Sequence, residues 1–84
     1  MRKSSLIEYI RKVVAELEQK PYEHWIKQKF PITYEDVLEG KEVQVQIDVL
    51  ETTPEYIHLI VEASDSPLGW WIRKHVGVII RRES

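Results

Sequence analysis

Two runs of alternating apolar and polar residues in the middle of the chain constrain the fold more than any other feature. In the first, valine or isoleucine occupies every second position from Val43 to Val49, and in the second the alternation continues from Ile57 to Ala63. A period of two is typical of a strand that buries one face. The segment 53–55 between the runs reads Thr-Pro-Glu, which has turn-forming chemistry. The sequence therefore predicts a β-hairpin closed by a three-residue loop.

The loop length determines which residues of the two strands lie opposite each other. A loop at 53–55 pairs Val49 with Leu59 and Ile47 with Val61, so that both apolar sets lie on the same face. The nominally outer face then carries three further apolar side chains, those of Leu50, Tyr56 and Ile60. Such a face, on a small sheet whose edges are unpaired, favours contact with a partner.

The amino-terminal segment has the period of a helix. Its apolar residues recur at intervals of three and four positions, at Leu6, Ile10, Val13, Val14 and Leu17. Ser5 and Glu8 have the spacing of a capping box, in which each side chain bonds to the backbone of the other residue. The sequence therefore predicts an amphipathic helix over about residues 5–20, which Pro21 ends.

Two shorter helical segments are expected between this helix and the hairpin. The first is indicated by the helical spacing of four aromatic or apolar residues, Tyr22, Trp25, Ile26 and Phe30. Pro31 ends it. Thr33 then resembles a helix cap and Gly40 a helix terminator, so residues 34–39 are expected to form one or two further helical turns.

The segment 66–82 has two interpretations. As a helix over 67–76, it has Pro67 in the first turn and Gly77 as its C-terminal cap, and a strand follows at 78–82. As a strand, the same residues extend the sheet into a β-meander, but Lys74 then points into the core. We favour the helix, because it leaves Lys74 in water and gives both Pro67 and Gly77 their usual positions. The last strand would then lie parallel to the second through a right-handed crossover.

These elements predict a single domain of the α+β class over residues 1–84. N-terminal helices pack on a small mixed or antiparallel three-stranded sheet, in the order α-α-β-β-α-β. If residues 67–76 form a strand instead, the sheet is a β-meander.

Composition excludes several classes of protein. The chain has no cysteine, so it has no disulfide framework, no thiolate zinc site and no cysteine nucleophile, and we expect it to be cytoplasmic. No apolar run approaches the roughly 20 residues that span a bilayer. The chain also has no asparagine and eleven glutamates, a bias typical of hyperthermophile proteins.

Candidate catalytic groups are sparse. The three glycines do not cluster into a phosphate-binding loop. Ser64, Asp65 and His75 could be arranged as a triad, and His58, His75 and Glu62 could bind a metal. A turn and a helix cap explain the first set more simply, and solvated histidines explain the second. We therefore expect no catalytic residue, no metal and no cofactor.

The charges are segregated along the chain. The net charge of −2 divides into +3 over residues 1–33, −8 over 34–65 and +3 over 66–84. The last segment also combines basic with aromatic side chains, and it supplies the candidate binding residues Trp70, Arg73, Lys74, His75, Arg81 and Arg82. Such mixtures bind phosphates and stack on bases in proteins that bind single strands.

Two functions are consistent with this pattern. The first is a small non-enzymatic interaction module that binds a protein partner or a second copy of itself, because basic and acidic surfaces can meet across a twofold axis. The alternative is a nucleic-acid-binding protein that uses the basic and aromatic C-terminal surface. The isoelectric point of about 5.9 favours the first, since nucleic-acid-binding domains commonly exceed about 9.

Overall fold

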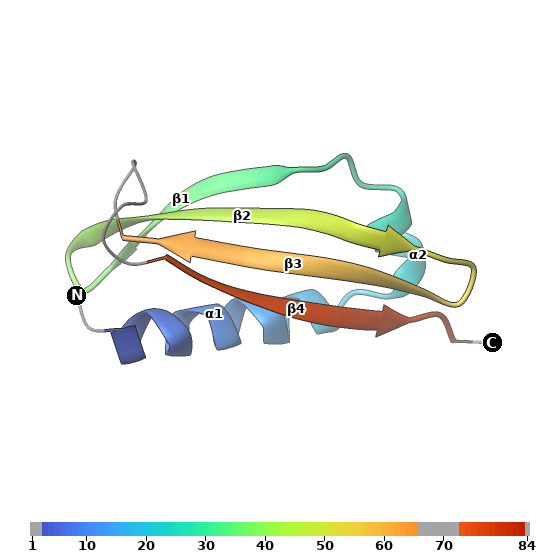
Figure 1. The fold of residues 1–84 in the computed structure, drawn as a ribbon, viewed down its shortest axis with the longest axis horizontal. Coiled ribbons are helices and arrows are strands. Elements are labelled where there is room, and N and C mark those ends of the chain that lie inside the picture. Colours follow the sequence, from blue (N-terminus) through green and yellow to red (C-terminus); the bar gives the residue numbers. More distant parts are fainter. Residues whose placement is uncertain (1–2, 66–72, 84) are drawn as a thin grey trace.

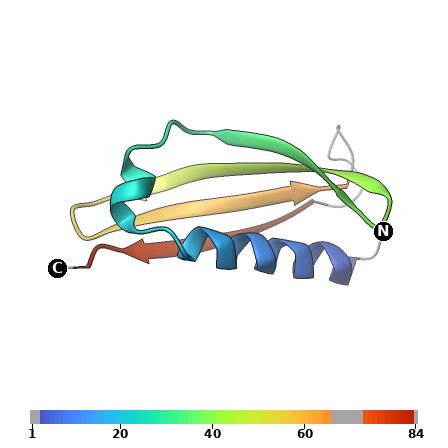
Figure 2. The ribbon, with the colours of Figure 1, turned by 180° about the vertical axis from the view of Figure 1, so that it is seen from behind.

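The chain forms a four-stranded antiparallel sheet with helices on one face. The computed structural model describes residues 3–65 and 73–83, with elements α1 (Lys3–Glu18), α2 (Tyr22–Ile26), β1 (Ile32–Leu38), β2 (Lys41–Thr52), β3 (Tyr56–Ser64) and β4 (Arg73–Arg81). The strand order β1-β2-β3-β4 follows the chain, and every pair is antiparallel. The α1 helix packs against β3 and β4 (Figure 1), and Figure 2 shows it from behind, in front of the sheet. The predicted α+β class is confirmed.

One face of the sheet and one stripe of α1 form the core. The stripe has the predicted spacing, with Leu6, Ile10, Val13 and Leu17 all buried. The strands contribute the alternating residues of the hairpin and two from β4: Val43, Val45, Ile47, Ile57, Leu59, Val61, Ala63, Val78 and Ile80. Burying a side chain of the size of Leu or Ile stabilises the fold by about 1.5–3 kcal/mol, so this contact holds the helix on the sheet.

The predicted hairpin is confirmed, and both predicted pairs occur. Val49 lies opposite Leu59 and Ile47 opposite Val61. Next to the turn the register differs from that of a three-residue loop, since Thr52 lies opposite Ile57. The pairing then shifts by one residue between Val49 and Glu51. Leu50 is the extra residue of this β-bulge, and its side chain is 57% exposed. The alternation alone contained no signal for the bulge.

The short α2 helix is fixed by two side-chain hydrogen bonds. The Trp25 indole Nε1 donates to the carbonyl of Leu17 at 3.0 Å, which satisfies an acceptor in the last turn of α1. The Tyr22 hydroxyl donates to the carbonyl of Thr53 at 2.6 Å and so ties α2 to the β2–β3 turn. The second helix thus begins where the sequence predicts but ends at Ile26, short of Phe30.

The expected helical turns at 34–39 are wrong, because residues 32–38 form strand β1. Glu39 and Gly40 then reverse the chain, with φ of 53° and 77°. Positive φ at both central residues is what a two-residue hairpin loop needs, and glycine adopts it without strain. Gly40 therefore closes a hairpin instead of ending a helix.

The capping-box interpretation of Ser5 and Glu8 is also wrong. Ser5 lies inside α1, and its hydroxyl donates to Oε1 of Glu39 at 2.7 Å. One turn further, the Tyr9 hydroxyl donates to Oδ2 of Asp36 at 2.8 Å. Both bonds connect α1 to the β1–β2 hairpin, although α1 does not cover strand β1.

The preferred interpretation of the C-terminal segment is corrected in its described part. Residues 73–76 belong to β4, which pairs antiparallel with β3, so the sheet has four strands and no parallel crossover. Residues 67–72 of the expected helix lie outside the described residues. Lys74 is half-buried, not inside the core. Because β4 is an edge strand, a lysine on its inner side can keep its ammonium group in water.

Candidate functional site

The structure does not gather the candidate basic residues on one surface. Trp70 lies outside the described residues, and the other five lie on or just after β4. Successive strand residues face opposite sides of the sheet. Lys74 therefore lies on the α1 side with Val78 and Ile80, and His75 and Arg81 lie on the other side. Arg73 stands at the start of β4.

Arg82 has a structural role at the end of β4. Its Nη1 donates to the carbonyl of Pro54 at 3.4 Å, and its Nε lies 3.9 Å from Oε1 of Glu23. Its backbone N–H donates to the carbonyl of Glu55 at 2.7 Å. An exposed ion pair contributes at most about 1 kcal/mol, so Arg82 serves mainly to join β4 to the β2–β3 turn.

We call the side of the sheet opposite α1 the open face, because neither helix of the described chain lies over it. The strand registers assign to it alternate residues of every strand: Thr33, Glu35, Val37, Glu42, Gln44, Gln46, Asp48, Glu51, Tyr56, His58, Ile60, Glu62, His75, Gly77, Ile79 and Arg81. Val37 is 65% and Ile79 50% exposed, and Tyr56 and Ile60 are half-buried. These apolar side chains make the open face a candidate contact surface.

The charge of the open face does not suit a phosphate backbone. Its residues on β1 and β2, two fully described strands, include the carboxylates of Glu35, Glu42, Asp48 and Glu51 and no lysine or arginine. On the β3–β4 side, Arg81 supplies a cation at the end of β4. Nucleic acids require a surplus of cations at the contact, which the part of this face on β1 and β2 does not offer.

His58 lies over the backbone of β4 in the middle of the open face. A Cβ atom added at Gly77 would come within 2.8 Å of His58 Nε2. Real Cβ atoms do not approach other atoms so closely, so a larger residue at 77 would displace the imidazole. Glycine in the interior of a strand often marks such a close approach, and here His58 is the cause.

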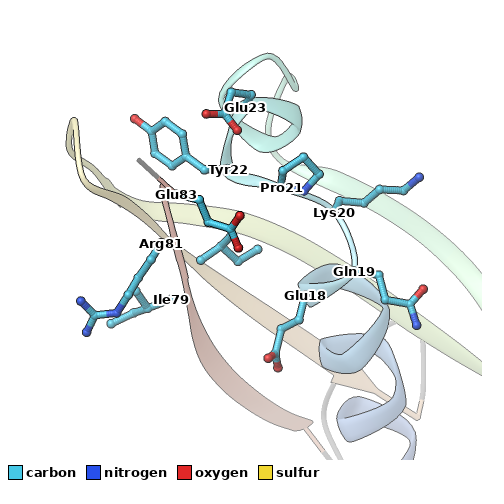
Figure 3. A pocket seen from close by; sticks show the side chains of 10 residues that line it. Glu18, Gln19, Lys20, Pro21, Tyr22, Glu23, Ile79, Arg81 and Glu83 are labelled. Carbon is cyan, nitrogen blue, oxygen red and sulfur yellow. The ribbon is translucent and has the colours of Figure 1, made fainter.

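A groove runs beside the C-terminal half of β4 (Figure 3). It has a volume of about 610 Å³, and its two walls are the segment Glu18–Glu23 and the residues 79–81 and 83. Three carboxylates line it, those of Glu18, Glu23 and Glu83, and they come from both walls. Lys20 and Arg81 line the groove as well, so this channel beside the strand edge is bordered by charges of both signs.

A second groove of about 390 Å³ lies between α1 and β1 and contains the Tyr9–Asp36 bond. Burial, with the bond to Asp36 next in effect, raises the pKa of Tyr9 above its ordinary value, and burial likewise raises the pKa of Tyr34. The Tyr9 hydroxyl and the Val37 N–H, which both donate to Asp36, lower the pKa of that carboxyl. Tyr9 and Asp36 thus form a polar contact between α1 and β1. Sequence periodicity could not predict this contact, because the two residues come from elements that are distant in the chain.

The described residues show neither a cluster of metal ligands nor a helix that could span a membrane. Residues 3–65 and 73–83 contain no group of three side chains that could hold a metal ion. His75 lies opposite Glu62 but His58 lies opposite Ile79, so the trio does not converge. No helix in this part of the chain is long and apolar enough to cross a bilayer.

Comparison with known proteins gives no family. No family profile matches the chain, and neither a curated protein nor a solved structure matches it.

Proposed function

We propose that this protein is a non-enzymatic interaction module that associates with a second copy of itself through the uncovered part of its sheet. The observation that carries the proposal is the exposure of Ile79, which is 50% accessible on edge strand β4, on the face opposite α1. Ile60 and Tyr56 are half-buried on the neighbouring strand and extend the apolar surface. A contact there would remove apolar area from water without moving the core.

Self-association accounts for the charge pattern better than a nucleic-acid contact. The protein has a net charge of −2, and its described basic residues on β4 are divided between two faces. A second copy offers both signs of charge at once, whereas a polyanion would have to approach the carboxylates of β1 and β2.

The test is the oligomeric state of a matched pair of variants. Sedimentation equilibrium of the full chain from micromolar to millimolar concentration is expected to show a dimer. Ile79→Glu should shift the equilibrium to monomer, because it places a carboxylate in the contact. Ile26→Glu is the control, since Ile26 is 44% exposed on α2, away from the open face, and it should leave the dimer intact.

A monomer at every concentration would contradict the proposal. If that monomer also binds a single-stranded oligonucleotide in a salt-sensitive way, and loses the binding in Arg81→Ala and Arg82→Ala, the nucleic-acid alternative takes its place. Equal effects of Ile79→Glu and Ile26→Glu on the dimer would place the contact elsewhere.

A further inference from the structure

Helix α1 packs against β3 and β4 and leaves the inner face of β1, at the other edge of the sheet, uncovered (Figure 1). Two hydrogen bonds still connect the helix to the β1–β2 hairpin, from Ser5 to Glu39 and from Tyr9 to Asp36. Both start in the N-terminal half of α1. The groove of about 390 Å³ extends from the second bond toward α2, and we call it the α1–β1 groove. Its volume lies within the usual range of small-molecule sites, about 300–1,000 Å³.

The floor of the α1–β1 groove is apolar and belongs to the core. Val13 and Leu17 contribute to it from α1, Ile47 from β2 and Trp25 from α2, and each of these side chains is at most 6% exposed. The indole Nε1 of Trp25 already donates to the carbonyl of Leu17. The floor therefore offers a ligand apolar and aromatic surface, and the indole N–H is not free to donate to it.

The rim of the groove carries a carboxylate on each wall. Glu16 lies on α1 and Asp36 on β1, and both are exposed. The Tyr34 hydroxyl lies within electrostatic range of both groups. Burial is the largest cause that raises the pKa of Tyr34, and the charges of Glu16 and Asp36 raise it further. Carboxylates on two walls that both oppose ionisation of one phenol create a negative potential in the groove, and such a potential attracts a cation.

Asp36 and two tyrosines suit an ammonium group. Each Asp36 oxygen accepts one hydrogen bond, Oδ2 from the Tyr9 hydroxyl and Oδ1 from the Val37 N–H. A carboxylate oxygen can accept two, so Asp36 retains capacity for a further donor. Tyr34 is 37% exposed and its hydroxyl interacts with that of Tyr9, which brings two aromatic rings to the rim. Tyrosine rings attract cations through their π-faces, and an ammonium group has three donors for the carboxylates.

Lys20 and His24 line the groove as well, but they do not reverse its charge. With His24 neutral at pH 7, the lining has two carboxylates, those of Glu16 and Asp36, and the one ammonium group of Lys20. Lys20 is exposed and lies beyond the end of α1. An anion held by Lys20 would have to approach both carboxylates, whereas a cation gains from both. The lining therefore favours a cationic ligand over an anionic one.

We propose that the α1–β1 groove binds a small organic ammonium ion, whose apolar body lies over Val13 and Trp25 and whose ammonium group lies between Glu16 and Asp36. The apolar floor alone would suit a neutral hydrocarbon, and the carboxylates on the rim add the preference for positive charge. The groove lies on the α1 side of the sheet, whereas Ile79 lies on the open face. The inference therefore goes beyond the proposed self-association and does not depend on it.

Three probes with similar phenyl-bearing bodies and different charges test the ligand class: phenethylammonium, phenethyl alcohol and hydrocinnamate. In an NMR titration of the full chain at pH 7, phenethylammonium should shift the Trp25 indole and Tyr34 ring signals until they saturate. Its affinity should exceed that of the neutral alcohol by at least about fivefold, because the alcohol keeps the contact with the floor and lacks the charge. The anionic hydrocinnamate should bind no more tightly than the alcohol.

Each other result of this titration overturns the proposal. Equal affinities for the three probes would mean that the groove accepts apolar molecules without regard to charge. Tightest binding of hydrocinnamate would mean that Lys20 determines the ligand. Shifts that grow in proportion to probe concentration and never saturate would mean that the groove is no binding site.

Glu16→Gln tests the position of the ammonium group. The change removes one carboxylate at nearly constant size, and the fold should hold because Glu16 is exposed. The dissociation constant for phenethylammonium should rise about threefold, whereas that for phenethyl alcohol should not change. Glu8→Gln, the same change at an exposed residue of α1 outside the groove, is the control and should bind like the wild type. Equal effects of Glu16→Gln and Glu8→Gln would overturn the placement of the ligand.

Discussion

At the scale of single residues, the bond between Tyr9 and Asp36 is the clearest example of chemistry that the sequence pattern hides. A tyrosine on a helix and an aspartate on an edge strand, 27 positions apart, meet at 2.8 Å. Each alters the other, since the bond raises the pKa of the phenol and lowers that of the carboxyl. The pair links α1 to a strand that the helix does not cover.

Tyr9→Phe should remove this link and leave the core in place. We expect the free energy of unfolding to fall by about 1 kcal/mol, the usual net value of one hydrogen bond. The pKa of Asp36 should rise toward its ordinary value, because its main stabilising donor is lost. Urea unfolding and an NMR titration of the carboxyl measure the two effects. An unchanged Asp36 pKa in the variant would contradict the assignment.

The same groups predict how stability depends on pH. Asp36 has a lowered pKa in the fold, so its contribution is present above the unfolded value near 4 and is lost as the pH falls through the folded value. Tyr9 and Tyr34 have raised pKa values, so their contributions are present below about pH 10 and are lost as the pH rises beyond it. Melting temperatures should therefore form a plateau between about pH 5 and 9. In Tyr9→Phe, both limbs should be shallower than in the wild type.

Gly77 gives a second test at this scale. Gly77→Ala should destabilise the wild type by up to about 1 kcal/mol. The new Cβ would lie 2.8 Å from His58 Nε2, so the imidazole ring must move. In a His58→Ala background the same change should be neutral or stabilising, since alanine suits a strand interior better than glycine. A double-mutant cycle by denaturant unfolding measures the difference. Identical costs in both backgrounds would show that His58 is not the constraint.

At the scale of elements, predictability follows burial. The hairpin of β2 and β3 was predicted correctly apart from the bulge at Leu50, because alternate residues of both strands are buried and so show a period of two. Helix α1 was predicted for the same reason, with a period of 3.6. The signal is created by the contrast between a buried and a solvated side.

Edge strands lack that contrast, and the preferred interpretation was wrong for β1 and for residues 73–76 of β4, whereas the strand predicted at 78–82 is part of β4. On β1, Tyr34 and Asp36 occupy the inner positions between Ile32 and Leu38, but α1 does not cover them and they stay exposed. On β4, Lys74 occupies an inner position at the margin of the sheet. Polar residues on the inner side erase the alternation, and cap-like residues such as Thr33 then favour a helix. Of the candidate binding residues on β4, His75 and Arg81 share the open face and Lys74 lies on the other, because a strand sends neighbouring residues to opposite faces.

The junction of the two helices provides a test at the element scale. Trp25→Phe should cost about 2–3 kcal/mol, because it leaves the Leu17 carbonyl without its donor in a buried setting and reduces the filled volume. Tyr22→Phe, which removes the part-buried bond to Thr53 and little volume, is the comparison and should cost about 1 kcal/mol. Chemical denaturation of both variants gives the ranking. A larger loss in Tyr22→Phe would mean that α2 is held chiefly by the β2–β3 turn.

At the scale of the whole molecule, exposed apolar residues lie on both edge strands, Val37 on β1 and Val76 and Ile79 on β4. The acidic middle segment of the chain forms the first three strands, and four of its carboxylates, those of Glu35, Glu42, Asp48 and Glu51, lie on the open face. The charge pattern of the sequence did not indicate which strand would be at the edge, since that depends on topology.

A self-associating protein should be stabilised by its own concentration. We expect the melting temperature to rise as the protein is concentrated from micromolar to millimolar, because the dimer forms from folded chains. The rise should shrink in 1 M salt, where charges beyond about 3 Å are screened. Differential scanning calorimetry of wild type and Ile79→Glu tests this. A wild-type melting temperature that does not depend on concentration would exclude a dimer of folded chains.

The strands lie in the sheet in the same order as in the chain, and this order affects the sequence of folding events. The turns at Glu39–Gly40 and at 53–55 each close a very short loop, so the entropy lost in forming β1–β2–β3 is small. Hairpins of this kind form within about 1–10 μs. The contacts of α1 with β3 and β4 join distant parts of the chain and come at a much greater entropic cost. We therefore expect the meander to assemble first and the amino-terminal helix, although it is the first element in sequence, to dock on it last.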